Sequence, residues 1–566
     1  MQQETSTQRL MHHSLNALLL NALHPPEYLI SLNKRANPRN IGLKARRLAS
    51  GKGKNAFFDH SCSPNDHEPP AAIRNLVKGS LQVCALSYSL HVRNRRLFTK
   101  RMLSVSCFIP ALLSCGNASS QEPAPTAASS TTAVTASTPE WKKCGDIECT
   151  TITVPFDYSS PELGSFTLPL TRLRALDDDL RQGVLLVNPG GPGAPGTSLA
   201  QNAAYYFSKD LMTHFDIVGW DPRGTGASTP TFDCGDSYSD FFANKRTVAS
   251  TQKFVDACKV KSPQIISHMS TAASARDIDA IRLALGEEKI SYFGFSYGST
   301  LGATWATLFP DTVQGAVFDA AATPNSTGAE RRLTQAEGFE KQLTAFLAQC
   351  SQKASCVFHN NGKAEQAFDE LLKTEATVNA TVVLTATASS LYDDSAWEDL
   401  AKALQSAQDG DGKLLLDLYN SYYYQDAGYE ASRNVSEASI ATICADEVLP
   451  PTTAEVDAQV DSFVRVAPRF GEFIGRDYTC ALWPAQKPAQ QELRISSTAP
   501  IVVVGSTNDP VTPLASSQSM SAALQNSRFI SVNSSRHTSY LKNVCATQLV
   551  DAFLIEGTLP PSNSQC

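Results

Sequence analysis

The stretch Ile290-Ser-Tyr-Phe-Gly-Phe-Ser-Tyr-Gly-Ser-Thr-Leu-Gly-Ala-Thr-Trp-Ala-Thr-Leu-Phe309 decides how this chain of 566 residues folds. Its first residues are mostly apolar and predict a buried strand, whereas those from Ser299 onward predict a helix. Gly294-Phe-Ser-Tyr-Gly298 lies at the junction, and a turn this tight leaves no space for side chains at its two glycines. The turn places Ser296 at the head of the helix, where the helix dipole favours developing negative charge. Ser296 is therefore the candidate nucleophile.

Short apolar segments on both sides of this stretch alternate with helix-like segments such as Ser274–Leu285. The predicted strands are Phe166–Leu173, Gly183–Asn188, Phe215–Trp220, Ile290–Gly294, Val313–Asp319, Ala499–Gly505 and Phe529–Asn533. Apolar strands separated by helices are typical of a mostly parallel sheet with helices on both faces. The predicted fold class is α/β.

Residues 331–492 interrupt this pattern with helix-compatible segments and no convincing buried strand. The clearest of these segments are Ala336–Ala348, Ala364–Leu372, Trp397–Leu404 and Leu414–Tyr423. Because strands resume afterwards and must join one sheet, we interpret residues 331–492 as a mainly helical cap inserted between two parts of an α/β core, residues 140–330 and 493–566. An independent second domain is the alternative.

Three segments precede the predicted core. Residues 1–101 show no sustained hydrophobic period and carry basic clusters. Residues 102–115 are mainly apolar, follow Lys100-Arg101 and end in Leu112-Leu-Ser-Cys115, but they are too few to span a bilayer, which takes about 20 residues. This segment resembles a bacterial lipoprotein signal, in which the cysteine carries the lipid. Residues 116–139 are rich in Ala, Ser, Thr and Pro and predict a flexible tether.

The signal lies unusually far into the chain. Export signals act at the N-terminus, so we hypothesise that residues 1 to about 91 come from a start assigned too far upstream. A genuine basic extension with a short apolar patch is the alternative.

The charge of the chain is unevenly distributed. Residues 1–115 hold 16 Lys and Arg against 5 Asp and Glu, so the remainder carries a formal net charge of −18. A body this acidic does not suit a phosphate backbone, and we expect no nucleic-acid partner.

Ten cysteines follow Cys115, and an even number in an exported chain favours disulfides. No Cys-x-x-Cys or His-x-x-x-His spacing occurs among them, so we expect no metal. The sequence leaves the connectivity open, but pairing of neighbours would close only short loops. These pairs are Cys144 with Cys149, Cys234 with Cys258, Cys350 with Cys356, Cys444 with Cys480, and Cys545 with Cys566.

A serine nucleophile needs a base, and the histidines beyond the tether are His214, His268, His359 and His537. Only His537 lies on a loop directly after a late core strand, where the base of such a nucleophile turn is found. Asp509 follows the preceding predicted strand, Ala499–Gly505, and completes the order Ser, Asp, His. The simpler interpretations are a solvated loop histidine and an aspartate that caps a turn before Pro510.

An oxyanion intermediate needs two backbone N–H donors. Tyr297, directly after the nucleophile, supplies one. The loop Asn188-Pro-Gly-Gly-Pro-Gly193 follows an early strand, and its glycines let the backbone approach a substrate, so Gly191 is the second candidate. A phosphate-binding loop is the competing interpretation, but the Lys-Ser/Thr pair that it needs is missing.

Five motifs together resemble the secreted bacterial tripeptidyl aminopeptidases, relatives of the proline iminopeptidases in the α/β-hydrolase fold. They are Asn188-Pro-Gly-Gly-Pro-Gly, Phe215-Asp-Ile-Val-Gly-Trp-Asp-Pro-Arg-Gly-Thr-Gly-Ala-Ser-Thr-Pro230, Gly294-Phe-Ser-Tyr-Gly-Ser, Cys480-Ala-Leu-Trp-Pro484 and Asp509-Pro-Val-Thr-Pro. The resemblance runs from about Trp141 to Cys566. It implies a serine exopeptidase that cleaves near free N-termini, with Ser296, Asp509 and His537 as its triad.

A free α-ammonium group needs a buried acidic partner near such a site. Cys444-Ala-Asp-Glu447 lies in the helical region and makes Asp446 and Glu447 the candidate anchor. Helix-face charges exposed to solvent are the simpler interpretation.

The sequence thus predicts an exported serine aminopeptidase or tripeptidyl aminopeptidase that acts on peptides without a cofactor. We expect it to be secreted or held at the cell envelope, with membrane attachment only through a lipid on Cys115. An extracellular esterase or lipase with the same triad is the alternative, and an inactive hydrolase-fold binding module is the third possibility.

Overall fold

The computed structural model describes residues 138–235, 241–374, 377–423, 434–447, 450–484, 493 and 499–566. The predicted extension (1–101), the signal segment (102–115) and all but the last two residues of the tether (116–139) lie outside these ranges, and their assignments stay predictions.

One sheet runs through the described part of the chain, in the strand order β1-β2-β3-β5-β4-β6-β7-β8-β9-β10. The strands are β1 (Lys142–Cys144), β2 (Ile147–Pro155), β3 (Ser165–Leu173), β4 (Gly183–Asn188), β5 (Phe215–Trp220), β6 (Ile290–Phe295), β7 (Val313–Asp319), β8 (Ile501–Ser506), β9 (Ser527–Val532) and β10 (Ser564–Gln565). Pairing is antiparallel from β1 to β5 and parallel from β5 to β10. The predicted α/β class is confirmed, and all seven predicted strands are present.

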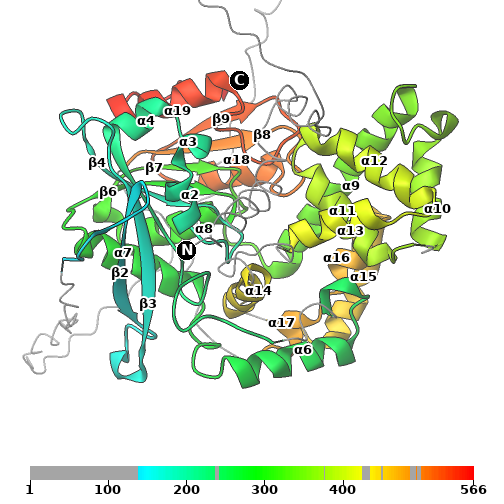
Figure 1. Ribbon diagram of the computed structural model, residues 1–566, viewed down its shortest axis with the longest axis horizontal. Coiled ribbons are helices and arrows are strands. Elements are labelled where there is room, and N and C mark those ends of the chain that lie inside the picture. Colours follow the sequence, from blue (N-terminus) through cyan, green and yellow to red (C-terminus); the bar gives the residue numbers. More distant parts are fainter. Residues whose placement is uncertain are drawn as a thin grey trace, which may run out of the picture. The chain divides into compact units, whose positions relative to one another are not determined.

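Helices pack on both faces of the sheet (Figure 1). Those of the core are α2 (Thr197–Gln201), α3 (Ala203–Tyr206), α4 (Lys209–His214), α6 (Val248–Lys261), α7 (Thr271–Ala284), α8 (Tyr297–Leu308), α18 (Leu514–Ala523) and α19 (Val544–Glu556). Successive side chains of a strand point to opposite faces, so Leu186 of β4 joins the core beneath α7 and α8, while Val187 joins the core beneath α4 and α19. Burial on both faces explains why the central strands are apolar throughout.

The described residues between β7 and β8 contain helices and no strand. These helices are α9 (Gly328–Gln352), α10 (Ala364–Thr374), α11 (Ala380–Leu391), α12 (Trp397–Gln408), α13 (Lys413–Tyr422), α14 (Val435–Ala445), α15 (Thr453–Val466), α16 (Gly471–Gly475) and α17 (Thr479–Leu482). Their apolar residues, such as Leu343 and Leu400, belong to the same hydrophobic cluster as Ile278 of α7 and Leu301 of α8. The helical region therefore packs continuously onto the core.

Five disulfides join the neighbouring cysteines that the sequence suggested. They are Cys144–Cys149, Cys234–Cys258, Cys350–Cys356, Cys444–Cys480 and Cys545–Cys566. The predicted disulfides are present, and the structure gives the connectivity that the sequence left open.

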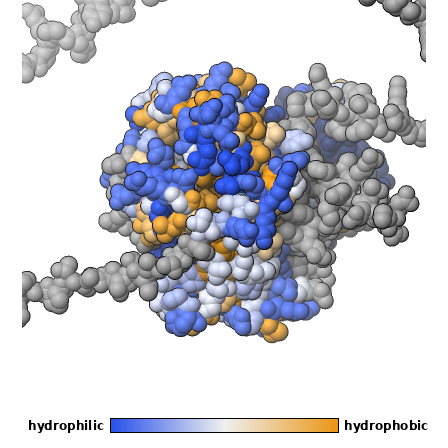
Figure 2. Space-filling view, turned by 60° about the vertical axis from the view of Figure 1, so that its left-hand side comes forward, coloured by the Kyte–Doolittle hydropathy of each residue, from blue (hydrophilic) through white to orange (hydrophobic). Residues whose placement is uncertain are grey.

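The surface mixes polar and apolar side chains. Figure 2 shows one face, on which hydrophilic and hydrophobic residues are interspersed. Singly exposed apolar residues such as Val260 are ordinary on a folded surface. None of the helices among the described residues is long and apolar enough to cross a membrane.

The Asp-Pro-Arg segment after β5 is held by a buried ion pair. Arg223 is 1% exposed, and its Nε and Nη2 donate to the two carboxylate oxygens of Asp277 at 2.8 and 2.6 Å. Its Nη1 donates to the carbonyl oxygens of Phe156 and His268. This set of contacts ties β2, the β5 loop and α7 together.

Replacing Asp277 with Ala is expected to lower the free energy of unfolding by about 3–5 kcal/mol, because it leaves the buried Arg223 guanidinium without its counter-charge. Chemical denaturation measures this loss. Asp178→Ala, which removes the exposed partner of Arg174, is the control and should change stability by less than about 1 kcal/mol. Equal effects of the two substitutions would contradict the role of the buried pair.

Candidate active site

Ser296 lies on the turn between β6 and α8. Its backbone φ of 53° and ψ of −122° are unusual for a residue with a side chain, and such conformations cost about 1–3 kcal/mol. A Cβ atom on Gly294 would lie 2.4 Å from the carbonyl oxygen of Gly298, so contact excludes a side chain there; a Cβ atom on Gly298 would lie 3.0 Å from the carbonyl oxygen of Asn188, which is tight. The Ser296 N–H donates to the carbonyl oxygen of Asp319 at 2.9 Å, which fastens the turn to β7.

His537 and Asp509 form a buried pair. The Nδ1 atom of His537 lies 3.0 and 2.9 Å from the two carboxylate oxygens of Asp509. The backbone N–H groups of Val511 and Thr512 donate to Asp509 Oδ1 as well. The backbone N–H of His537 donates to the carbonyl oxygen of Tyr392. The Tyr392 ring meets the imidazole edge-on, with 5.4 Å between the two ring centroids. With Nδ1 engaged by the carboxylate, Nε2 is the nitrogen left for a nucleophile.

Ser296 and His537 line one cavity of about 650 Å³. Asp509 lies behind His537 and is 3% exposed. The structure thus places the three predicted triad residues, which are far apart in the sequence, around a single site. Aromatic side chains of the helical region also line the cavity, among them Phe339 and Tyr392.

The glycine loop after β4 lies against the serine turn. A Cβ atom on Gly190 would lie 2.5 Å from the carbonyl oxygen of Phe295 and 3.1 Å from the Tyr297 nitrogen. Gly190 and Gly191 have φ values of 93° and 105°, a region that favours glycine. Gly191 and Tyr297 both line the cavity, so the two candidate oxyanion donors border the space beside Ser296.

Two positioning side chains were not identified from the sequence. The Asp319 carboxylate, fully buried at the end of β7, accepts the N–H of Ser539 at 2.9 Å and of Tyr540 at 2.8 Å. Burial raises the pKa of Asp319, whereas these two backbone donors lower it. The Thr512 hydroxyl lies 3.0 Å from both Asp509 Oδ2 and the carbonyl oxygen of Ala320.

Both positioning contacts meet at the end of β7. Asp319 holds the serine turn through its carbonyl oxygen and the histidine loop through its carboxylate, while the next residue, Ala320, holds Thr512 of the aspartate loop. No local sequence signal marks Asp319, because aspartate is also a frequent turn residue at the ends of strands.

The two predicted anchor residues lie in different surroundings. Asp446 borders the cavity and accepts the Thr271 N–H at 2.8 Å and the Thr271 hydroxyl at 2.5 Å. The Thr271 hydroxyl also contacts the Tyr297 hydroxyl. Burial raises the pKa of Asp446 to about 6. Glu447 instead packs on Gly328 at the start of α9 and does not line the cavity, so only Asp446 is placed to meet a substrate.

The remaining polar groups include no metal cluster. Within the described ranges, no three His, Cys, Asp or Glu side chains are grouped so that they could hold a metal ion.

The sheet is mostly parallel, a serine turn follows β6, and a histidine–aspartate pair lies on the loops after β8 and β9. These features define a hydrolase of the α/β type. The family model for the alpha/beta hydrolase fold matches residues 183–544, and the chain belongs to this family.

Three relatives illustrate its place in the family. The serine protease Hip1 of Mycobacterium tuberculosis is 31% identical over 471 residues, which cover 76% of this chain and 89% of that protein. The tripeptidyl aminopeptidase of Streptomyces lividans is 27% identical over 459 residues, covering 75% of this chain and 85% of that protein. A carboxylesterase B of Mycobacterium tuberculosis is 29% identical over 452 residues, covering 74% and 86%. The resemblance drawn from the motifs is confirmed.

Replacing Asp319 with Asn is expected to lower kcat for a small acyl ester by about tenfold to a hundredfold, because one or both N–H groups of the histidine loop lose a charged acceptor. KM should change little, since Asp319 does not line the cavity. Steady-state kinetics on the folded variant measures the split. Asp311→Asn, at an exposed position just before β7, is the control. A rise in KM with kcat unchanged would contradict the assignment.

Proposed function

We propose that the chain is an exported serine peptidase that cleaves peptide bonds near free N-termini, as an aminopeptidase or tripeptidyl aminopeptidase. The observation that carries this proposal is the placement of Ser296, His537 and Asp446 around one cavity, with Asp509 bonded to His537. Two of the relatives named above, a serine protease and a tripeptidyl aminopeptidase, support a peptidase.

The reaction begins at the Ser296 hydroxyl. Its oxygen attacks the scissile carbonyl carbon while His537 Nε2 accepts the hydroxyl proton. Asp509 holds the imidazole with Nδ1–H toward its carboxylate and stabilises the imidazolium that forms. The imidazolium then gives its proton to the leaving amine. Water attacks the resulting ester by the same route and releases the acyl product.

Two backbone groups are assigned to the oxyanion. Tyr297, directly after the nucleophile, and Gly191 of the glycine loop both line the cavity, and we assign their N–H groups to this role. Such donors stabilise the charge that develops on the carbonyl oxygen, and each contributes about 3 kcal/mol to the transition state. Their positions are fixed before substrate arrives, by the start of α8 and by the glycine loop.

Asp446 is assigned to the substrate's α-ammonium group. Its carboxylate borders the cavity and is joined through Thr271 to the side chain of Tyr297, the residue next to the nucleophile. A partly buried carboxylate with a raised pKa gains from a cationic partner, because the cation offsets the cost of partly removing the negative charge from water. This contact would distinguish free N-termini from blocked ones.

An extracellular esterase is the second candidate, because a relative at 29% identity is named carboxylesterase B. The proposed triad would serve an ester as well as an amide. The acidic side chain of Asp446 in the cavity favours the peptidase, because it can pair with a substrate's α-ammonium group, which a neutral ester lacks.

Export is supported by the five disulfides, which persist in oxidising compartments. The lipid anchor at Cys115 lies outside the described residues and is proposed from the sequence alone.

A fluorophosphonate probe is expected to label the wild-type protein and not Ser296→Ala, because the probe reacts with an activated serine. The wild type should also hydrolyse aminoacyl and tripeptidyl amides with free N-termini, and Ser296→Ala should lose at least about a thousandfold in kcat. Mass spectrometry and amide turnover measure the two effects. Labelling without any amide turnover, but with ester turnover, would favour the esterase, and equal labelling of both proteins would refute the nucleophile.

The KM for a peptide with a free N-terminus is expected to rise about tenfold between pH 7 and pH 5, because Asp446, with its pKa raised to about 6, is mostly ionised at the first pH and mostly protonated at the second. Kinetics across this range measures the change. Asp446→Asn should show a high KM that no longer depends on pH. The N-acetylated peptide is the control, and a parallel rise in its KM would rule out Asp446 as the anchor.

A further inference from the structure

Helix α14 forms the wall of the cavity that carries Asp446. Ser439, Ile440 and Ile443 of α14 line the cavity, and Asp446 follows the end of the helix. The first turn of α14 also touches the glycine loop: a Cβ atom on Gly193 would lie 2.4 Å from the carbonyl oxygen of Val435. The placement of α14 therefore sets both the substrate wall and one side of the loop that carries Gly191.

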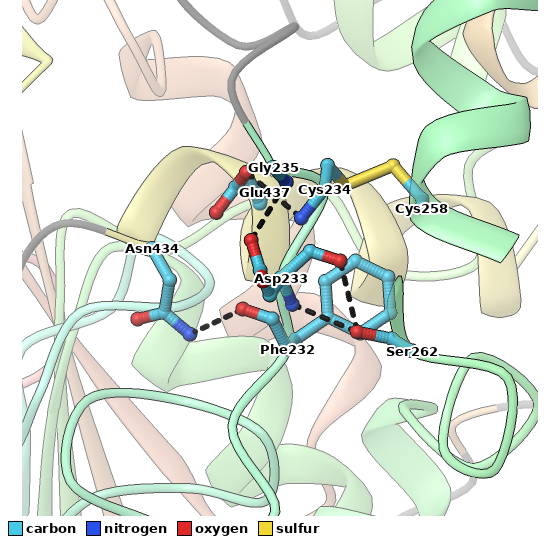
Figure 3. The surroundings of a disulfide bond; sticks show 8 residues. All are labelled: Phe232, Asp233, Cys234, Gly235, Cys258, Ser262, Asn434 and Glu437. Atoms are coloured by element: carbon cyan, nitrogen blue, oxygen red, sulfur yellow. Dashed lines mark hydrogen bonds between the residues drawn. A yellow bond between two sulfur atoms is a disulfide. The ribbon is translucent and has the colours of Figure 1, made fainter. Parts of the chain in front are cut away.

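The N-terminal end of α14 has the sequence pattern of a capping box, with Asn434 at the N-cap and Glu437 three residues later. Other helices of the chain make this box, for example α15 with Thr452 and Glu455. In α14 the Asn434 side chain makes no capping hydrogen bond, and Glu437 bonds elsewhere. Both side chains point instead to residues 224–235, here called the docking loop (Figure 3).

Asn434 is satisfied entirely by the docking loop. Its Nδ2 donates to the carbonyl oxygens of Gly224 at 2.7 Å and Phe232 at 3.1 Å, and its Oδ1 accepts the Gly226 N–H at 3.1 Å. Asn434 is 6% exposed. If its side chain were removed, water could not easily reach these three backbone groups to replace the lost hydrogen bonds.

Glu437 makes the second attachment. One of its carboxyl oxygens accepts the Cys234 N–H at 3.1 Å, and the side chain is 6% exposed (Figure 3). Burial, with a smaller effect from the charge of Asp233, raises the pKa of Glu437 to about 8. At neutral pH the group is therefore mostly a neutral acid, and α14 docks without a buried charge.

The docking loop is itself fastened to the core. Cys234 forms a disulfide with Cys258 of α6, and the Asp233 N–H donates to the Ser262 hydroxyl at 2.8 Å (Figure 3). The far end of α14 is held by a disulfide from Cys444 to Cys480. Because the C-terminal end of α14 is linked covalently, the orientation of the helix over the cavity depends on the contacts at its N-terminal end.

We propose that Asn434 and Glu437 are positioning residues: by docking α14 on the docking loop, they hold Asp446 and the α14 wall against the bound peptide. This inference rests on the proposed peptidase function and assigns specificity to residues that do not touch the substrate. Loss of either contact would displace the α14 wall while leaving Ser296, His537 and Asp509 in place. Those three lie on the loops after β6, β9 and β8, which Asp319 and Ala320 fasten at the end of β7.

The test compares Glu437→Leu, Asn434→Ala and Glu437→Gln. The first two should raise KM for a peptide with a free N-terminus by about tenfold, with kcat for a small acyl ester changed by less than about threefold, because each removes buried hydrogen bonds worth roughly 1–2 kcal/mol. Glu437→Gln keeps a neutral acceptor for the Cys234 N–H and should restore KM to within about twofold of the wild type.

Glu455→Leu is the matched control, because it removes a glutamate from the same helix position in α15, where the side chain does cap its own helix. It should leave KM unchanged. Parallel loss of peptide and ester turnover in Glu437→Leu, an unchanged KM, or failure of both disruptive variants to fold would each overturn the proposal. Absence of peptide turnover in the wild type would instead refute the peptidase function, so the two failures are distinguishable.

Discussion

The buried carboxylate of Asp319 is the contact on which the geometry of the site depends. The loops after parallel strands gather at one edge of a sheet, but gathering alone leaves each loop free to shift by an ångström or more, which is enough to disable acyl transfer. Asp319 removes that freedom, because its carbonyl oxygen binds the serine turn and its carboxylate binds the histidine loop. The neighbouring carbonyl of Ala320 adds the aspartate loop through Thr512.

Close backbone contact is the second constraint. Gly190 touches the serine turn, Gly193 touches α14, and neither position has space for a side chain. The glycine loop thus lies between the nucleophile and the helical region and contacts both. This arrangement explains why the loop is a run of glycine and proline, and why specificity in our proposal depends on how α14 is docked.

Much of this was predictable from local patterns. Apolar strands buried on both faces gave clear signals, the serine turn indicated a candidate nucleophile, and chain order indicated His537 and Asp509 as its candidate partners. Features that depend on contacts between distant segments were not predictable. Strands β1 and β2, at one end of the sheet, are partly exposed and lack a continuous apolar run, and no local pattern distinguishes Asp319 from any other aspartate at a strand end. Asn434 and Glu437 fit a local capping pattern, yet they bond to the docking loop and do not cap their own helix. Glu447, one residue from Asp446, faces α9 because neighbouring side chains at a helix end diverge.

The size of the cavity limits which molecules can reach Ser296. A chamber of about 650 Å³ is within the range of small-ligand pockets and far smaller than any folded domain. A folded protein is too bulky for such a cavity, so under the proposed function the substrate would be a short peptide or an unfolded chain end. Under the proposed peptidase function, a cavity of this size would protect copies of the enzyme from one another, because a folded chain cannot reach the nucleophile.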